Sequence, residues 1–205
     1  MLSDTLRAIS NALQTPVVAV LLLLMAAALF MLGSLAVEAF TERSRLSVKL
    51  PELADALRES GASSETIENS GLLRRQKQAL LELTRHPALT PAMRESLAVR
   101  LVAAERSRFE SIVYITDLIA RLGPMFGLLG TLIPLGPGII ALGRGDTYTL
   151  SLSLLTAFDT TIAGLISAAV AFVISTVRKK WYAGYMSSLE MAMECVLEAE
   201  NEKAL

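Results

Sequence analysis

Two apolar stretches decide the fold of this chain: residues 122–142, LGPMFGLLGTLIPLGPGIIAL, and residues 150–177, LSLSLLTAFDTTIAGLISAAVAFVISTV. A membrane-spanning helix needs about 20 mainly apolar residues, so each stretch is long enough to cross a bilayer. Gly143-Arg144-Gly145-Asp146 lies between them and predicts a tight polar turn. We therefore expect a hairpin of two membrane helices, the first of which is entered through residues 112–121.

A third apolar stretch lies nearer the N-terminus, over residues 17–37. It holds 21 residues without a charged side chain, which is also enough to cross a bilayer. Pro16 precedes it, at a position where the start of a helix tolerates proline. A cleaved signal peptide is the alternative, but the stretch is longer than a signal-peptide core, and Asp4 offsets the charge of Arg7. We therefore expect a retained membrane helix.

The composition agrees with a membrane protein and excludes several functional classes. Of the 205 residues, 53% are hydrophobic, above the roughly 45–50% that is usual in soluble domains. The net charge of −1 gives no indication of nucleic acid binding. One cysteine, Cys195, and one histidine, His86, exclude an intrachain disulfide and a His/Cys metal cluster. Because nucleotide-binding and hydrolase motifs are also missing, we expect no enzymatic activity, cofactor or metal.

The positions of Lys and Arg predict the orientation in the membrane, because cytoplasmic loops carry an excess of them. Residues 38–111 contain twelve of the nineteen, and Arg178-Lys179-Lys180 directly follows the third span. The middle region and the C-terminus are therefore predicted to be cytoplasmic, and the N-terminus and the hairpin turn to lie outside. Trp181, Tyr182 and Tyr185 follow the basic triplet and predict an aromatic anchor at the membrane interface.

The predicted fold is all-α, with three transmembrane helices and long helices that extend from the membrane into a cytoplasmic region. Helices are expected over 51–58 and 72–84, and a further helix starts at Pro91 and runs into the second span. The charged residues Glu105, Arg106, Arg108 and Glu110 are expected on a solvated face of that helix. The divisions of the chain are an N-terminal segment with the first span (1–37), a cytoplasmic helical region (38–111), a membrane core (112–177, with spans over 112–142 and 150–177) and a cytoplasmic C-terminal helix (178–205).

The second span carries the first group of candidate functional residues. Gly123 and Gly127 are four residues apart, and with Gly130 they allow a close approach of another helix. Thr131 lies on the same stripe as Gly127, and its hydroxyl either faces a pore or bonds back to its own helix. Pro134 and Pro137 are expected to weaken the helix near its outer end, because each removes a backbone donor.

The third span carries a second group, in which Thr160, Thr161 and Gly164 follow Asp159. Asp159 points about 200° away from Thr161 around the helix. A carboxylate in the bilayer costs about 2.5–3.5 kcal/mol, so it must be protonated, hydrated or paired. Asp159 is therefore a candidate proton site, and a structural pair with a hydroxyl or an adjacent subunit is the alternative.

Closer to the cytoplasmic edge, Asp117 and Arg121 stand four residues apart, which predicts an intrahelical salt bridge.

The segments Gly127–Thr131 and Ala157–Leu165 resemble the TolQ/ExbB/MotA proton-channel family. The order of elements is similar too: one helix, a cytoplasmic helical region, a hairpin of two helices and a cytoplasmic tail. Three spans in a short chain resemble the TolQ/ExbB branch more than the four-span MotA branch. The specific motifs cover only residues 123–177, whereas the likeness in architecture covers most of the chain.

The resemblance implies a proton-channel subunit of the inner membrane that assembles as a ring of five around two copies of a single-span partner of the ExbD/TolR/MotB kind. An aspartate of the partner would face Thr131 and Thr161, which match the family's pore threonines. Proton flow would then turn the ring relative to the partner and perform mechanical work. Asp159 and the run Pro134–Gly138 depart from the family pattern. Asp159 could provide an additional proton site. The run Pro134–Gly138 raises the question of whether the second span is a straight helix.

Two other functions compete with this interpretation. A non-conducting membrane scaffold for an envelope or membrane complex would need no polar path through the spans. A small-solute transporter is disfavoured, because the chain has no inverted repeats. The coupling ion is expected to be H⁺ rather than Na⁺, because the spans lack a rich cluster of oxygen ligands. The kind of work performed does not follow from the sequence.

Overall fold

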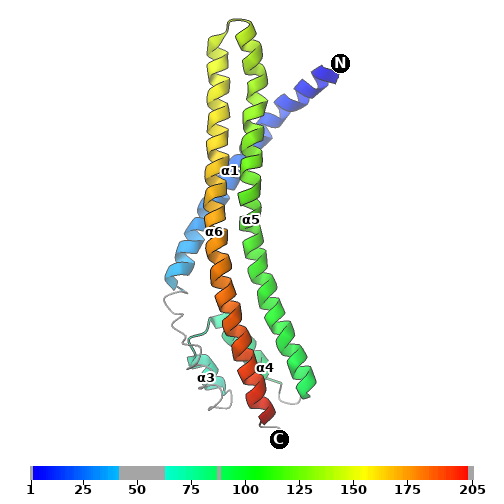
Figure 1. Ribbon diagram of the computed structural model, residues 1–205, viewed down its shortest axis with the longest axis vertical. Helices are drawn as coiled ribbons and strands as arrows, with labels where there is room; N and C mark the ends of the chain where they lie inside the picture. The colour runs from blue at the N-terminus through cyan, green and yellow to red at the C-terminus, as the bar shows by residue number, and fades with distance from the viewer. Residues whose placement is uncertain (1, 42–62, 87–88, 203–205) are drawn as a thin grey trace. The chain divides into compact units, whose positions relative to one another are not determined.

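The computed structural model describes residues 2–41, 63–86 and 89–202, and every regular element in these ranges is an α-helix (Figure 1). In chain order the helices are α1 (Leu2–Thr41), α3 (Ser64–Asn69), α4 (Arg74–Thr84), α5 (Pro91–Gly143) and α6 (Thr147–Glu202). The predicted all-α fold is confirmed. The helix expected over 51–58 lies outside the described residues.

Three of these helices, α1, α5 and α6, are long and apolar enough to cross a membrane, as the sequence predicts. α1 begins well before the predicted first span, so Pro16 lies inside the helix rather than ahead of it. The residues on its N-terminal side include many good helix formers, such as Leu, Ala, Arg and Gln. Their helix propensity continues α1 beyond the end of the apolar stretch.

α5 is one continuous helix although it contains Pro124, Pro134 and Pro137. Pro134 and Pro137, which are expected to weaken its outer end, do not interrupt it: the helix passes through both and ends at Gly143. Each proline removes one backbone donor, but the other backbone groups in an apolar stretch have only their own helix as a partner. α6 is also unbroken, so the third span and the predicted C-terminal helix are a single element.

The chain divides into two compact units, and α5 and α6 contribute to both. The first unit comprises residues 1–35 and 113–177, which hold the apolar stretches quoted above. The second unit comprises residues 36–112 and 178–205, with α3, α4, the start of α5 and the end of α6. In α5 and α6 the boundary between the units falls close to the ends of the apolar runs, where mainly apolar sequence gives way to sequence that contains many charged residues.

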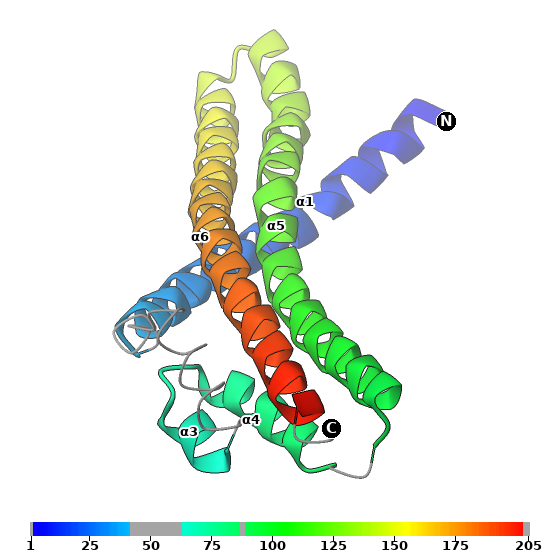
Figure 2. The same ribbon diagram turned by 60° about the horizontal axis from the view of Figure 1, so that its bottom comes forward.

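In the first unit, α1 crosses the antiparallel pair of α5 and α6 (Figure 2). Val17 and Leu21 of α1 pack against Ile133 of α5. Farther along α1, Ala28 packs in a cluster with Ile119 of α5 and Ala171 of α6. The remaining surface of the three helices is lined by exposed large apolar side chains, as a lipid-facing or subunit-facing surface requires. Those side chains include Leu23, Phe30, Leu128, Leu132, Phe158, Leu165 and Phe172.

The second unit has a hydrophobic core of its own between α3, α4, α5 and α6. Ile67 of α3, Leu80 of α4, and Leu189 and Val196 of α6 are completely buried in it. α4 matches the helix predicted over 72–84 within two residues at its start and ends at the predicted residue, Thr84. Burial of this apolar face, rather than helix propensity, stabilises so short a helix.

Tyr182 and Tyr185 belong to the second unit's packed interior and do not form the predicted membrane-interface anchor. Only 6% of the surface of Tyr182 and 7% of that of Tyr185 is exposed. The ring of Tyr182 stacks on that of Phe109 with a centroid separation of 4.4 Å. The two tyrosines share the face of α6 that carries Leu189 and Val196, so helical spacing places them inward.

Gln76 of α4 is a buried polar residue that ties α4 to α6. Its Nε2 donates to the carbonyl of Tyr185 at 2.7 Å, and its Oε1 accepts from the backbone N–H of Leu73 at 3.0 Å. The amide therefore satisfies the start of α4 and a carbonyl of α6 with one side chain.

Gln76→Leu should destabilise the second unit by about 1–3 kcal/mol, because buried polar groups of Leu73 or Tyr185 would lose their partner. Gln78→Leu is the matched control, because Gln78 is exposed on the same helix. Unfolding of each variant in detergent, followed by circular dichroism, gives the difference. Equal stability of the two variants would contradict this role for Gln76.

The turn between α5 and α6 is built on Gly145 and Asp146. Gly145 has φ of 78°, a left-handed conformation that favours glycine. Asp146 caps α6: one carboxylate oxygen accepts from the Thr149 N–H at 3.0 Å and the other from the Thr149 hydroxyl at 2.5 Å. These hydrogen bonds favour the charged form and hold the pKa of Asp146 below its usual value of 3.8.

Because this pKa is lowered in the folded chain, the cap should be intact above the usual pKa and be lost as the pH falls through the lowered one. Asp146→Ala should speed amide exchange at Thr149 at neutral pH. Asp146→Asn should keep part of the protection, since Asn also caps helices, and lose its pH dependence. Exchange that is identical in all three proteins across this pH range would show that Asp146 does not cap α6.

Candidate ion-pathway residues and the helix interface that holds them

The glycines of the second and third spans lie where α5 and α6 approach most closely. A methyl group placed on Gly164 would lie 2.5 Å from the carbonyl oxygen of Gly123. One on Gly130 would lie 2.6 Å from Cβ of Thr160. A methyl group placed on Gly127 would lie 3.5 Å from the Cα of Gly164, which is an ordinary contact distance. The four glycines named from the sequence therefore come together in one interface within a single chain.

The hydroxyl groups of the three candidate threonines bond to carbonyl groups of their own helices. Thr131 donates to Leu128 at 2.7 Å, and Thr161 donates to Ala157 at 3.1 Å. Thr160 bonds to Thr156 and Ala157, at 3.0 Å each. Such bonds use the single donor of each hydroxyl and leave oxygen lone pairs as acceptors.

Burial separates Thr160 from the other two threonines. Only 7% of its surface is exposed, because it packs against Gly130 in the interface between α5 and α6. Thr131 and Thr161 are half-buried, so each keeps surface for a second molecule. The geometry therefore places Thr160 at a packing position, whereas Thr131 and Thr161 are accessible from outside the chain.

Asp159 lies on the face of α6 that is turned away from α5. It is exposed between Phe158, 63% exposed, and Ile162, 55% exposed. Within the part of the chain that the structure describes, no hydrogen bond or ion pair involves its carboxylate. A carboxylate on an apolar, unpartnered face of a membrane span needs a partner beyond this chain, water or a proton.

Two polar contacts were not foreseen from the sequence. Asp117 of α5 accepts a hydrogen bond from Ser175 of α6, in place of the predicted pairing with Arg121. In the second unit, Arg178 of α6 pairs with Glu38 of α1 at 3.3 Å, and both side chains are largely buried. Removing one member of a buried ion pair costs about 3–5 kcal/mol. The sequence gives little indication of either contact, because the two residues of each pair lie far apart along the chain.

No group of three or more His, Cys, Asp or Glu side chains that could hold a metal ion occurs among the described residues. Near the glycine interface, the spans present the hydroxyl oxygens of Thr131 and Thr161, which can accept hydrogen bonds, and the carboxylate of Asp159.

Gly164→Ala should destabilise the packing of α5 on α6 by about 1–3 kcal/mol, because the added methyl group meets backbone that cannot move aside. Gly136→Ala is the matched control in α5, since nothing lies within 4 Å of a methyl group at that position. It should be neutral or slightly stabilising. Thermal unfolding of both variants in the same detergent measures the difference, and a fully stable Gly164→Ala protein would contradict the close contact.

Comparison with known proteins agrees with this geometry. No curated protein matches the chain. The family model described as the MotA/TolQ/ExbB proton channel family matches residues 64–191. The match includes the glycine interface, Asp159 and the three threonines, and it also covers α3, α4 and the part of the second unit's core that precedes residue 192. With three membrane-spanning helices and a match over most of its length, this chain belongs to the MotA/TolQ/ExbB proton channel family.

Proposed function

We propose that the chain is the ring-forming subunit of a motor that is driven by ion-motive force and couples proton flow to mechanical work. Membership of the proton-channel family, with α5 and α6 as the matched membrane hairpin, is the observation that carries this proposal. In the proposed assembly, five copies surround two copies of a single-span partner of the ExbD/TolR/MotB kind, which carries an intramembrane aspartate. The complex lies in the inner membrane, with the N-terminus outside and the middle region and C-terminus in the cytoplasm.

Thr131 and Thr161 have a defined chemical role in this proposal. Their donors are engaged with Leu128 and Ala157, so each presents an acceptor oxygen to its surroundings. A protonated carboxyl group of the partner can donate to such an oxygen, whereas a carboxylate cannot. The threonines therefore favour the protonated partner aspartate inside the ring, and they release it when the proton leaves. Thr160 supports this indirectly, by holding α6 against Gly130.

Asp159 has a different place in the proposal. It lies on the outward face of α6, so it meets an adjacent subunit or a water-filled space rather than α5 of its own chain. We expect it to exchange a proton or to bond to a neighbouring subunit. H⁺ is the proposed coupling ion, and the described residues hold no group of three or more His, Cys, Asp or Glu side chains that could bind a metal ion instead. A chain of this kind needs no cofactor and performs no enzymatic reaction.

A non-conducting scaffold is the second candidate, and one observation favours it. The hydroxyl donors of Thr131, Thr160 and Thr161 are all bonded within their own helices, as they would be if these side chains served packing alone. In a scaffold these threonines would serve packing only, and replacing them with an isosteric apolar residue would change nothing but stability.

The test is proton flux into liposomes that contain the protein and its aspartate-bearing partner. Thr161→Val keeps the side-chain shape but removes the acceptor oxygen, and it should abolish most of the flux. Thr176→Val is the matched control, because Thr176 lies on the same helix and bonds to its own helix in the same way. A potential of 100 mV supplies about 2.3 kcal/mol per proton, enough to drive measurable flux.

The outcomes separate the two functions. Flux in the wild type and in Thr176→Val, but not in Thr161→Val, supports the channel. Equal flux in all three proteins contradicts the role of Thr161, and no flux from an intact complex favours the scaffold. Asp159→Asn in the same assay then shows whether its carboxylate lies in the proton path.

A further inference from the structure

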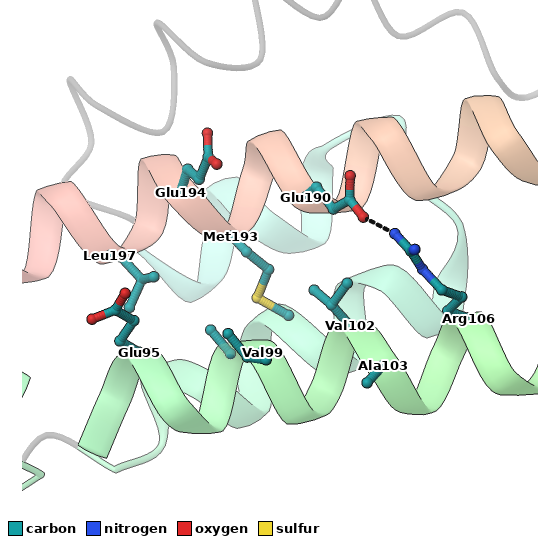
Figure 3. A pocket seen from close by; sticks show the side chains of 10 residues that line it. Glu95, Val99, Val102, Ala103, Arg106, Glu190, Met193, Glu194 and Leu197 are labelled. Atoms are coloured by element: carbon teal, nitrogen blue, oxygen red, sulfur yellow. Dashed lines mark hydrogen bonds and ion pairs between the residues drawn. The ribbon is translucent and has the colours of Figure 1, made fainter. Parts of the chain in front are cut away.

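A groove of about 430 Å³ runs along the second unit between α5 and α6 (Figure 3). Its floor is apolar, with Val99 and Val102 from α5 and Met193 and Leu197 from α6. The groove borders the core that α3 and α4 share with these helices: Ala98 and Met193 belong to that core, and Val102 and Leu197 pack against it. Val99, by contrast, is 64% exposed. The complete lining is Glu95, Ala98, Val99, Val102, Ala103, Arg106, Glu190, Met193, Glu194 and Leu197.

The edges of this groove are acidic. Glu95 and Glu194 are exposed, and no cationic side chain among the described residues forms an ion pair with either of them. Glu190 is paired with Arg106 at 2.5 Å, so one of the three carboxylates is balanced by the groove's own arginine. An apolar floor with two uncompensated carboxylates suits an occupant that has small side chains flanked by positive charges.

The chain carries such a surface on another part of α5. Arg100, Ala104 and Arg108 are four residues apart and exposed, which makes a stripe with a small residue between two arginines. At about 100° per residue, this stripe lies on the side of α5 opposite to the groove-lining residues Glu95 and Arg106. The same copy therefore cannot place the stripe in its own groove, whereas a second copy can.

The two surfaces also lie at the same level along the helices. Two ion pairs between antiparallel α5 and α6 fix this level: Arg94 with Glu200 at 3.9 Å and Arg106 with Glu190 at 2.5 Å. Arg100 is midway between the two arginines, and Glu194 is within one residue of the midpoint between the two glutamates. At 1.5 Å per residue, Arg100 and Glu194 are level to within about 2 Å.

We propose that this groove receives α5 of a second copy of the chain, with Arg100 of one copy paired to Glu194 of the next. The proposal rests on the ring assembly proposed above and assigns its contact outside the membrane spans. A closed ring joins two different surfaces of each subunit, and the groove and the arginine stripe are two such surfaces. Copies related by an axis parallel to the spans keep the same level, as the match between Arg100 and Glu194 requires. Arg108 then lies near Glu190, on the same rim.

Site-directed cross-linking of the full-length protein in membranes tests this contact. In a Cys195→Ala background, the double variant Arg100→Cys, Glu194→Cys should give a ladder of cross-linked species with a short bis-maleimide reagent. Each single-cysteine variant should remain a monomer on the gel, and a mixture of the two should stop at the dimer. Arg100→Cys with Glu65→Cys is the matched control, since Glu65 is an exposed residue of α3 outside the groove.

Charge reversal gives a second, independent readout. Arg100→Glu and Glu194→Arg should each reduce the oligomer several-fold by native mass spectrometry in detergent, and the two together should restore most of it. Glu65→Lys, an equal change of charge, should leave the oligomer intact. Wild-type oligomers without a ladder and without sensitivity to either reversal would overturn the groove contact and leave the proton channel standing. A wild-type monomer would overturn both. A cross-linked dimer from Arg100→Cys alone would also overturn the proposal, because it requires like surfaces to meet.

Discussion

The close contact of α5 with α6 at Gly123 and Gly164 is the constraint on which the other features of the membrane unit depend. Two helix backbones approach within the reach of one methyl group there, so each partner must be glycine and the rotation of both helices is fixed. In a bilayer no hydrophobic effect drives helices together, and tight packing of small residues has to supply the association. Once this contact is set, Thr160 is turned inward, Thr131 and Thr161 keep free surface, and Asp159 faces away from the hairpin.

A second constraint explains why the long helices are unbroken. Backbone N–H and C=O groups in an apolar setting can bond only within their helix, so α5 continues through three prolines and α6 continues far beyond its apolar stretch. Both helices therefore contribute to both units. In the second unit they pack around a hydrophobic core of the kind found in soluble proteins. The core around Leu80 and Leu189, the stacked rings of Phe109 and Tyr182, and the Gln76 amide belong to this second kind of packing. One pair of helices thus carries two chemically different interfaces.

These two interfaces suit a subunit that works in an assembly. The first unit leaves large apolar side chains and the carboxylate of Asp159 exposed on its surface. Lipid or neighbouring subunits have to cover these groups, because the chain itself does not. The second unit leaves an apolar groove with acidic edges on one side of α5 and an arginine stripe on the other. Both patterns suit contacts with other copies of the chain. The chain belongs to the proton-channel family, and the ring around a partner that we propose would give both surfaces a role.

The sequence by itself determined the number and position of the membrane helices, the hairpin turn, the short helix α4 and the family, because apolar length, turn residues and local motifs are properties of neighbouring residues. The glycines indicated which side of α5 packs against another helix, but the sequence did not determine which polar side chains this packing buries. Thr160 and Thr161 are adjacent in sequence but about 100° apart on α6, so only the packing against Gly130 decides which is buried. The partners of Asp117, Arg178 and the two buried tyrosines likewise lie on other helices. Such contacts depend on helix rotation and level, which tertiary packing sets and local sequence does not encode.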